Sequence, residues 1–483
     1  MNRYSLQLIQ RWSRMGSRFL PFADVATAEL PLSRLLRLSL FQVSVGMALV
    51  LLVGTLNRVM IVELGVPAAL VAAMVALPVM YAPFRALVGF RSDTHRSALG
   101  WRRVPYIWMG SMIQFGGLAV MPFALLVLSG GGNAAAWPSW VGQAGAGLCF
   151  LMVGVGMHTV QTAGLALATD LAPPQAQPRV VGLMYVMLLL GTIVSALIFG
   201  AFLQDFTPGR LVQVVQASAV ATLVLNGLAL WKQESRHPGR YQRSTKPAPP
   251  PPDFGPVWRQ YVASVGVRQR LLSIGLGTMA FSMQDVLLEP YGGQVLGMGV
   301  GATTWLTAAL AVGGLAGFAL ASVVLGRGGD AARTATLGAW AGLPAFSGVL
   351  ISASNQSVSL FACSVMLIGF GAGLFSHGTL TLTMQNASKE QTGLALGAWG
   401  AVQATAAGVA VALGGLLRDI VGGHAEQGAF GPALAQPATG YAFVYGLEML
   451  LLCATIGALL VLTRARRKAL TTPGPLIVPL GVD

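Results

Sequence analysis

The charged residues inside apolar stretches are the part of this sequence best suited to chemistry. Asp285 and Glu289 lie four positions apart in MQDVLLEPYGG, so a helix would bring both carboxylates onto one face, where two buried negative charges repel each other. One of them is then protonated, or a cation lies nearby. Arg58 is the only basic residue inside an early apolar stretch, with Asn57 beside it and Glu63 at the outer end, so we expect it to supply that cation. The cluster predicts either a structural ion pair or a group that takes part in ligand passage or proton coupling.

Almost everything around these residues is apolar. The chain has 483 residues, of which 54% are hydrophobic and 10% charged, whereas roughly a quarter of the residues in a soluble domain are charged. Apolar segments of about twenty residues recur, and each is long enough to cross a hydrocarbon core of roughly 30 Å as a helix. Twelve spans are predicted, at 39–62, 67–90, 105–128, 140–168, 180–203, 211–231, 270–294, 301–325, 334–352, 358–383, 393–416 and 438–462. The sequence therefore predicts an all-α polytopic membrane protein.

The basic residues predict its orientation. On this map all but three of the 30 Lys and Arg lie on one side of the membrane, the exceptions being Arg58, Arg210 and Arg418. Positive charge is retained in the cytoplasm, so both termini are expected there. The net charge of +14 then reflects topology and contact with anionic lipid. Nucleic-acid binding is not expected, because no basic domain with interleaved aromatic residues is present.

The chain divides in the middle. The polar, basic and proline-rich stretch at 232–256 is typical of an extended linker, with six spans before it and six after. The expected parts are a cytoplasmic amphipathic segment at 1–38, a six-helix half at 39–231, a cytoplasmic linker at 232–269, a second six-helix half at 270–463 and a cytoplasmic tail at 464–483. Two parallel six-helix repeats joined by a basic loop are typical of the major facilitator superfamily fold.

A charged loop between the second and third spans carries the motif expected of that superfamily, in a stretched form. Gly89 and Asp93 form G-x-x-x-D, and the basic pair Arg102 and Arg103 follows only after an inserted THRSAL. The aspartate can pair with an arginine or accept a hydrogen bond from a nearby helix N-terminus. We therefore expect these residues to anchor the ends of the two helices.

This stretched loop is similar to that of one branch of the superfamily. RSDTHRSALGWRRVPYIW at 91–108 resembles the PucC/LhaA family, the bacteriochlorophyll delivery branch, and the resemblance extends to 30–47, 54–67 and 283–293. It implies an assembly factor that binds bacteriochlorophyll and delivers it to nascent light-harvesting antenna polypeptides. It also implies the inner, intracytoplasmic membrane of a photosynthetic bacterium, and as partners the antenna polypeptides and possible contacts with the reaction centre or the pigment-synthesis and insertion machinery.

Two histidines gain meaning from that resemblance. His158 has Gln161 and Thr162 three and four positions on, and His377 has Thr381 four positions on, so each lies on a polar helical face. A neutral imidazole can ligate the magnesium of a chlorin ring, and these two are the possible ligands. Alternatively, each histidine is a structural residue that bonds to a helix carbonyl or to the neighbouring threonine.

Other classes of function find little support in the sequence. No nucleotide-binding loop, metal-protease motif or nucleophile elbow is present, and the three cysteines are too few and scattered for a metal site. We expect no enzyme activity, no nucleotide and no protein-bound metal. Two alternatives stay open: a proton-coupled secondary transporter of a small solute, and a ligand-free lateral scaffold for antenna helices. The sequence does not indicate whether the core or the peripheral antenna is the client. It also does not indicate where the pigment binds or what the oligomeric state is.

Overall fold

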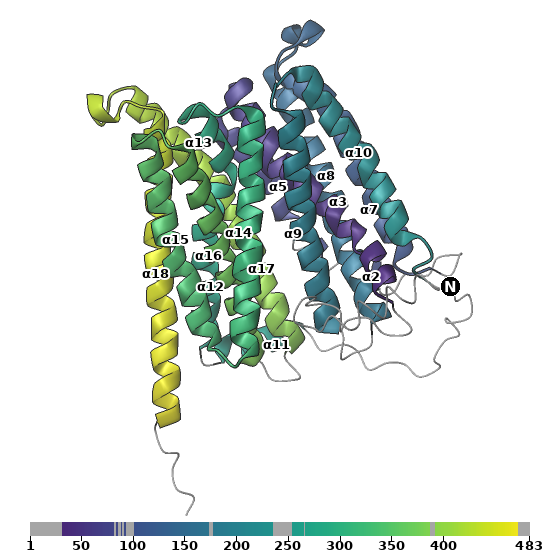
Figure 1. Cartoon of the computed structure of the whole chain (residues 1–483), viewed down its shortest axis with the longest axis vertical. Helices are drawn as coiled ribbons and strands as arrows, with labels where there is room; N and C mark the ends of the chain where they lie inside the picture. Colours follow the sequence, from purple (N-terminus) through teal and green to yellow (C-terminus); the bar gives the residue numbers. More distant parts are fainter. Residues whose placement is uncertain are drawn as a thin grey trace, which may run out of the picture. The chain divides into compact units, whose positions relative to one another are not determined.

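The computed structural model describes residues 31–81, 84–85, 88, 91–92, 101–172, 177–234, 254–264, 266–386 and 392–471 (Figure 1). Within these ranges every regular element is helical, which confirms the all-α prediction. The predicted amphipathic segment before residue 31, the motif residues Gly89 and Asp93, and most of the linker lie outside the described residues.

Most of the helices that the structure describes are separated by only a few residues, the exceptions being the stretches 81–103 and 231–253. In chain order they are α2 (Leu32–Leu38), α3 (Leu40–Leu49), the π-helix η2 (Val50–Thr55), α4 (Leu56–Arg58), the π-helix η3 (Val59–Glu63), α5 (Ala68–Met80), α7 (Val104–Leu128), η5 (Gly132–Ala136), α8 (Ser139–Leu171), α9 (Gln177–Phe202), α10 (Pro208–Leu230), α11 (Phe254–Ala263), α12 (Val267–Ser282), η6 (Met283–Val286), α13 (Leu288–Gln294), α14 (Val300–Gly326), α15 (Ala331–Ser354), α16 (Val358–Gln385), α17 (Thr392–Glu426), η8 (Pro432–Leu434) and α18 (Ala438–Thr471).

The helices are those of a multi-pass membrane protein. Ten of them, among the described residues, are long and apolar enough to cross a bilayer, or eleven if the pair α12–η6 and α13, bent by 40°, counts as one broken span. The second predicted span is represented by the shorter apolar helix α5. Twelve crossings were predicted, so the described residues contain fewer helices of sufficient length than the prediction requires.

Helix ends differ from the predicted span ends. The first span begins at Leu32 rather than at 39, and α18 continues to Thr471, beyond the predicted start of the tail at 464. Backbone hydrogen bonding does not stop where hydropathy falls, and the Arg, Lys and Ala residues that follow 463 are good helix formers. Hydropathy therefore locates the hydrocarbon-spanning part of a helix, not its ends.

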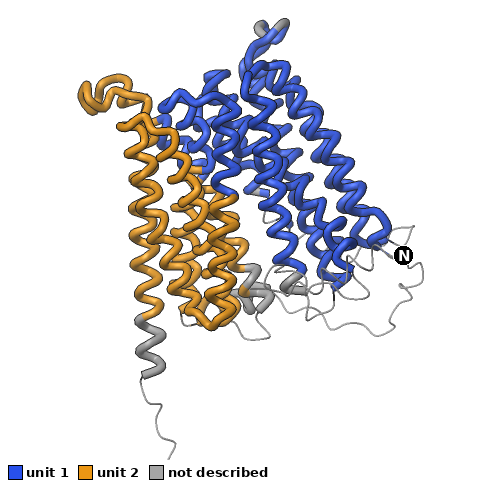
Figure 2. Tube along the Cα trace, in the orientation of Figure 1, with its two compact units in different colours: residues 1–246, 285–311, 411–419 blue, residues 247–284, 312–410, 420–483 orange. Residues whose placement is uncertain are grey.

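The chain forms two compact units (Figure 2). Unit 1 comprises 1–246, 285–311 and 411–419, and unit 2 comprises 247–284, 312–410 and 420–483. The units thus differ from the halves predicted at 39–231 and 270–463, since two segments from the second half of the sequence belong to unit 1. The first of these segments begins in η6, where the helix breaks, and includes α13.

Small residues let the helices of each unit approach closely. In unit 1, α7 and α8 meet at Gly110 and Gly156, where an added Cβ on Gly110 would lie 2.9 Å from the Gly156 carbonyl oxygen. In unit 2, α15 and α16 meet in the same way at Gly338 and Gly371, with 2.5 Å from an added Cβ on Gly338 to the Gly371 carbonyl oxygen. Membrane helices have no hydrophobic drive to associate in lipid, so this close van der Waals contact is what joins them.

Candidate functional site

The first polar site of unit 1 lies at the start of α13, just after the break that separates this helix from η6, and it includes Pro290. Proline has no N–H, so Pro290 cannot bond to the carbonyl of Val286, four residues earlier. The side chain of Asn57, fully buried on α4, donates to that carbonyl at 2.9 Å, and to the Val53 carbonyl at 2.9 Å. Asn57, a candidate residue of the first predicted span, thus supplies a donor for the carbonyl that Pro290 leaves without its usual partner.

Arg58 is the central cation of this site, but its ion-pair partner differs from the prediction. Its side chain is only 3% exposed, and the guanidinium pairs with Glu63 and donates to the Met298 carbonyl at 3.1 Å. It also packs on Gly293 of α13, where an added Cβ would lie 3.0 Å from Nη2. A pair with Asp285 or Glu289 was expected, and the structure gives the pair to Glu63 instead.

Glu289 lies in the same polar layer. Its side chain is buried, one oxygen accepts from the Thr307 hydroxyl at 2.5 Å, and the other oxygen has no hydrogen-bond partner. Gly54 of η2 faces it, and a Cβ on that glycine would overlap the carboxyl group. Glu289 is thus a buried acid with one open acceptor site.

The carboxylates of Asp285 and Glu289 do not share one continuous helical face. Asp285 is half-buried in η6, Glu289 lies in α13, and the chain bends by 40° between the two helices. The expectation of a single face assumed a regular helix through Pro290, and the break removes it.

A second polar cluster holds the start of α7. Arg102 and Arg103 both bind Asp170 at the end of α8, at 2.6 and 3.1 Å, and Arg103 donates to the Ser92 hydroxyl at 2.6 Å. The carboxylate of Glu234 accepts the backbone N–H groups of Arg102, Arg103 and Val104 at 2.7, 3.1 and 3.0 Å. A negative charge at a helix N-terminus is favourable because it meets these unpaired donors and the positive end of the helix dipole.

The arginine pair thus anchors the loop through acids that the motif does not contain. Asp93, the predicted anchor, and Gly89 lie outside the described residues, so their role stays a prediction. Sequence analysis did not single out Glu234, although it is the first acidic residue after the sixth predicted span.

Glu234→Ala is expected to lower the free energy of unfolding by about 1–2 kcal/mol, because three N–H donors of α7 lose their acceptor. The thermal midpoint of the purified protein in mild detergent, followed by tryptophan fluorescence, measures the effect. Glu426→Ala, at an exposed acid without a hydrogen bond among the described contacts, is the matched control. An equal midpoint in the two variants would contradict the assigned cap.

The two candidate histidines have different surroundings. His158 lies on α8, in unit 1; the Pro78 carbonyl approaches its ring, but neither ring nitrogen forms a hydrogen bond. His377 lies on α16, in unit 2, where its Nε2 is 3.4 Å from the Ser322 hydroxyl and its ring packs against Phe318. His158 is therefore the imidazole with the more open coordination chemistry.

The predicted polar face around His158 is divided between two neighbours. Gln161 donates to Gln42 of α3 at 3.3 Å, whereas the Thr162 hydroxyl donates to the backbone carbonyl of His158 at 2.7 Å and accepts from Arg85 at 3.1 Å. The threonine thus does not bond to the imidazole, and the other structural alternative, a bond to a helix carbonyl, would have to use Pro78 of α5.

A resident metal site has no support in the part of the chain that the structure describes. No three His, Cys, Asp or Glu side chains gather there in a way that could hold a metal ion.

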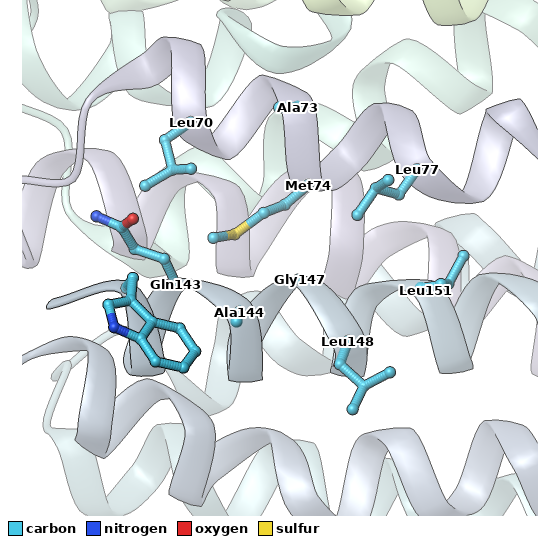
Figure 3. Close-up of a pocket in the computed structure, with 10 residues that line it drawn as sticks. Leu70, Ala73, Met74, Leu77, Gln143, Ala144, Gly147, Leu148 and Leu151 are labelled. Carbon is cyan, nitrogen blue, oxygen red and sulfur yellow. The ribbon is translucent and has the colours of Figure 1, made fainter. Parts of the chain in front are cut away.

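Apolar grooves on unit 1 add surfaces that sequence analysis missed. One groove, of about 480 Å³, lies between α5 and α8, with Met74 and Leu77 facing Gly147 and Leu148 and with Gln143 at one end (Figure 3). A larger groove of about 930 Å³ lies at the ends of α7 and α10. Apolar grooves of this kind can hold acyl or isoprenoid chains. The sequence does not reveal them, because an apolar residue inside a span looks the same whether it lines a groove or faces lipid.

Comparison with known sequences places the chain among close relatives. The family model described as PUCC protein matches residues 55–467. Identity is 61% over 421 residues with Protein PucC of Rhodovulum sulfidophilum, covering 87% of this chain and 92% of that protein. Identity is 55% over 452 residues with Protein PucC of Cereibacter sphaeroides, covering 94% and 96%.

Comparison with solved structures concerns the fold. A bacterial homologue of the lysosomal transporter Spinster gives a TM-score of 0.68 at 15% identity, over 92% of this chain and 98% of that one. A bacterial homologue of the iron transporter ferroportin gives 0.62 at 15% identity, over 88% and 97%. At this identity the likeness shows the fold alone, and it confirms the predicted major facilitator superfamily fold.

Proposed function

The chain belongs to the PucC family, and we propose that it is an assembly factor for bacterial light-harvesting antenna complexes. It binds bacteriochlorophyll in the membrane and brings it to nascent antenna polypeptides, without enzyme activity of its own. The observation that carries this proposal is the family match along 55–467, which includes every described candidate residue. The family match supports a place in the inner, intracytoplasmic photosynthetic membrane. The basic residues support a cytoplasmic location of both termini, because nearly all of them fall on one side of the predicted map.

The proposed partners follow from this role. They are the antenna polypeptides, anionic lipid around the basic loops, and the reaction centre or the pigment-synthesis and insertion machinery. Bacteriochlorophyll is cargo in this account, not a resident cofactor.

His158 is the chain's best candidate for holding the pigment. A bound bacteriochlorophyll would supply a magnesium ion, for which one imidazole nitrogen would be a ligand. The described contacts leave both nitrogens of His158 available, and the Thr162 hydroxyl is already used by the backbone and by Arg85. His377 is the second candidate, with one orphaned nitrogen and one weak contact to Ser322.

Complementation tests the proposal. This chain would be expressed in Cereibacter sphaeroides whose own 55% identical PucC has been deleted, and the near-infrared absorption of antenna complexes would be compared with that of the reaction centre. The proposal predicts that antenna absorption is restored together with antenna polypeptide levels. Cells that accumulate the chain in the membrane and still lack antenna would contradict it.

A second candidate function, proton-coupled transport of a small solute, is favoured by one observation. Glu289 is a buried carboxylate with one oxygen unpartnered, next to the Arg58–Glu63 pair, in a fold shared with transporters. Such an acid can bind and release a proton during transport. If this is the function, proteoliposomes should take up a solute under an imposed pH gradient, and Glu289→Gln should abolish that uptake.

A further inference from the structure

Arg85 is an arginine of unit 1 that has no acidic partner among the described residues. It follows α5 and is half-buried, and no carboxylate among the described residues lies within ion-pair distance of it. Its Nε donates to the Thr162 hydroxyl at 3.1 Å. This bond uses one donor of the guanidinium, and the donors on the two terminal nitrogens stay available for another group. A partly buried guanidinium that keeps a neutral hydroxyl as its contact lacks the counter-charge that usually offsets its desolvation.

The side chains of two further residues, His158 and Tyr185, lie within electrostatic range of Arg85. The imidazole of His158, one turn before Thr162 on α8, is within the electrostatic reach of Arg85 and has two ring nitrogens without a hydrogen-bond partner. Tyr185 of α9 lies within the same range of Arg85, and its side chain is 42% exposed. Side chains from α8 and α9 thus lie within electrostatic range of Arg85, and one of them, Thr162, is hydrogen-bonded to it.

We propose that Arg85, with His158 and Tyr185 around it, binds an anionic oxygen group, a carboxylate or a phosphate, of a membrane-soluble ligand. The planar guanidinium fork matches the two oxygens of such a group, and its hydrogen bonds to an anion are about twice as strong as those between neutral groups. Thr162 is a positioning residue, because it fixes the inner side of the fork and so turns the outer donors toward the ligand. A neutral His158 nitrogen adds a further donor to the same oxygens.

The inference does not depend on the proposed function, because the anion has two possible sources. One is a free propionate on a chlorin, which would make the site selective for a pigment acid over its ester. The other is the phosphate of a lipid headgroup. Both sources present the same oxyanion to Arg85.

Binding to the purified full-length protein in uncharged detergent tests it with two matched pairs of probes. The first pair is a magnesium chlorin with a free propionic acid and the same chlorin as its phytyl ester, followed by absorption. The second pair is phosphatidylglycerol and phosphatidylcholine, followed by native mass spectrometry. The wild type is expected to prefer the anionic member of at least one pair, and which pair shows the preference identifies the source.

Arg85→Gln is expected to reduce the affinity for that anionic probe by about tenfold or more, the loss of one charge-assisted hydrogen bond, with little change for the neutral probe. Arg85→Lys should lie between, because a point charge remains without the fork. Thr162→Val should lower the same affinity, by a smaller factor than Arg85→Gln does. It serves as the test variant if Arg85→Gln does not fold. Arg210→Gln, in an exposed pair with Asp205, is the control.

Two results would overturn the proposal. One is a wild type that binds the anionic and neutral members of both pairs equally. The other is an anion affinity that Arg85→Gln leaves unchanged, which would mean that Arg85 is neutralised within the chain, for instance by Asp93, outside the described residues.

Discussion

Arg58→Ala is expected to lower the free energy of unfolding by about 3 kcal/mol, the lower end of the range of about 3–5 kcal/mol for breaking a buried pair. The lower end applies because the Glu63 side chain is 36% exposed, so water can solvate part of the freed charge. The variant also leaves the Met298 carbonyl without its donor and a void over Gly293. Thermal unfolding in detergent, together with the amount of protein in the membrane, measures the loss.

Second-site changes identify the partner of Arg58. Adding Glu63→Gln to Arg58→Ala should recover part of the lost stability, because it removes the uncompensated carboxylate. Adding Asp285→Asn, at the acid that the sequence suggested, should recover less. The assignment of the pair would be wrong if Asp285→Asn restored stability and Glu63→Gln did not.

His158→Leu is expected to remove most of the bacteriochlorophyll that copurifies with the protein, since no other imidazole among the described residues of unit 1 has both nitrogens free of hydrogen bonds. His377→Leu should have a smaller effect, because its ring already contacts Ser322 and Phe318. The ratio of pigment absorption to protein, measured on folded protein after size-exclusion chromatography, gives the result.

A matched control separates ligation from a general effect of losing a histidine. His424 is exposed near the end of α17 and contacts the Ile420 carbonyl at 2.7 Å, so His424→Leu should leave the pigment ratio unchanged. If His158→Leu and the double variant with His377→Leu both keep the full ratio, the pigment is held elsewhere, and the grooves beside α5 and α10 become the next places to test.

The fold followed from the sequence because hydropathy and charge report directly on the membrane. Long apolar runs and the position of the linker were enough to predict an all-α membrane protein with the superfamily fold. The short helix α5 and the 40° break before α13 were not predictable from hydropathy, which averages over a window of residues and does not respond to backbone geometry. The exchange of segments between units was equally invisible, since it depends on contacts between distant parts of the sequence.

The missed partner of Arg58 has a specific cause. Arg58 and Glu63 are five positions apart, and in an α-helix only side chains three or four apart face each other. The structure places Val59–Glu63 in a π-helix, whose wider turn brings residues five apart together. Nothing in the apolar sequence VMIVE signals that change of turn, so the pair could not be derived from α-helical spacing.

Arg85 was missed for a different reason. Sequence analysis counted it only among the many basic residues on the cytoplasmic side of the predicted map, where positive charge needs no further explanation. Only the contact with Thr162 and the position beside His158 distinguish it from its neighbours. Asn57 is the opposite case, because Pro290 announces a carbonyl that needs a donor, and the structure supplies that donor from the first span.

The central claim, that this chain carries bacteriochlorophyll for antenna assembly, is tested most directly by the absorption spectrum of the wild-type protein purified from pigmented cells that lack antenna polypeptides. The account predicts a near-infrared bacteriochlorophyll band that elutes with the protein in a fixed ratio and is lost in His158→Leu. Folded protein that elutes from the same cells without that band would contradict the account.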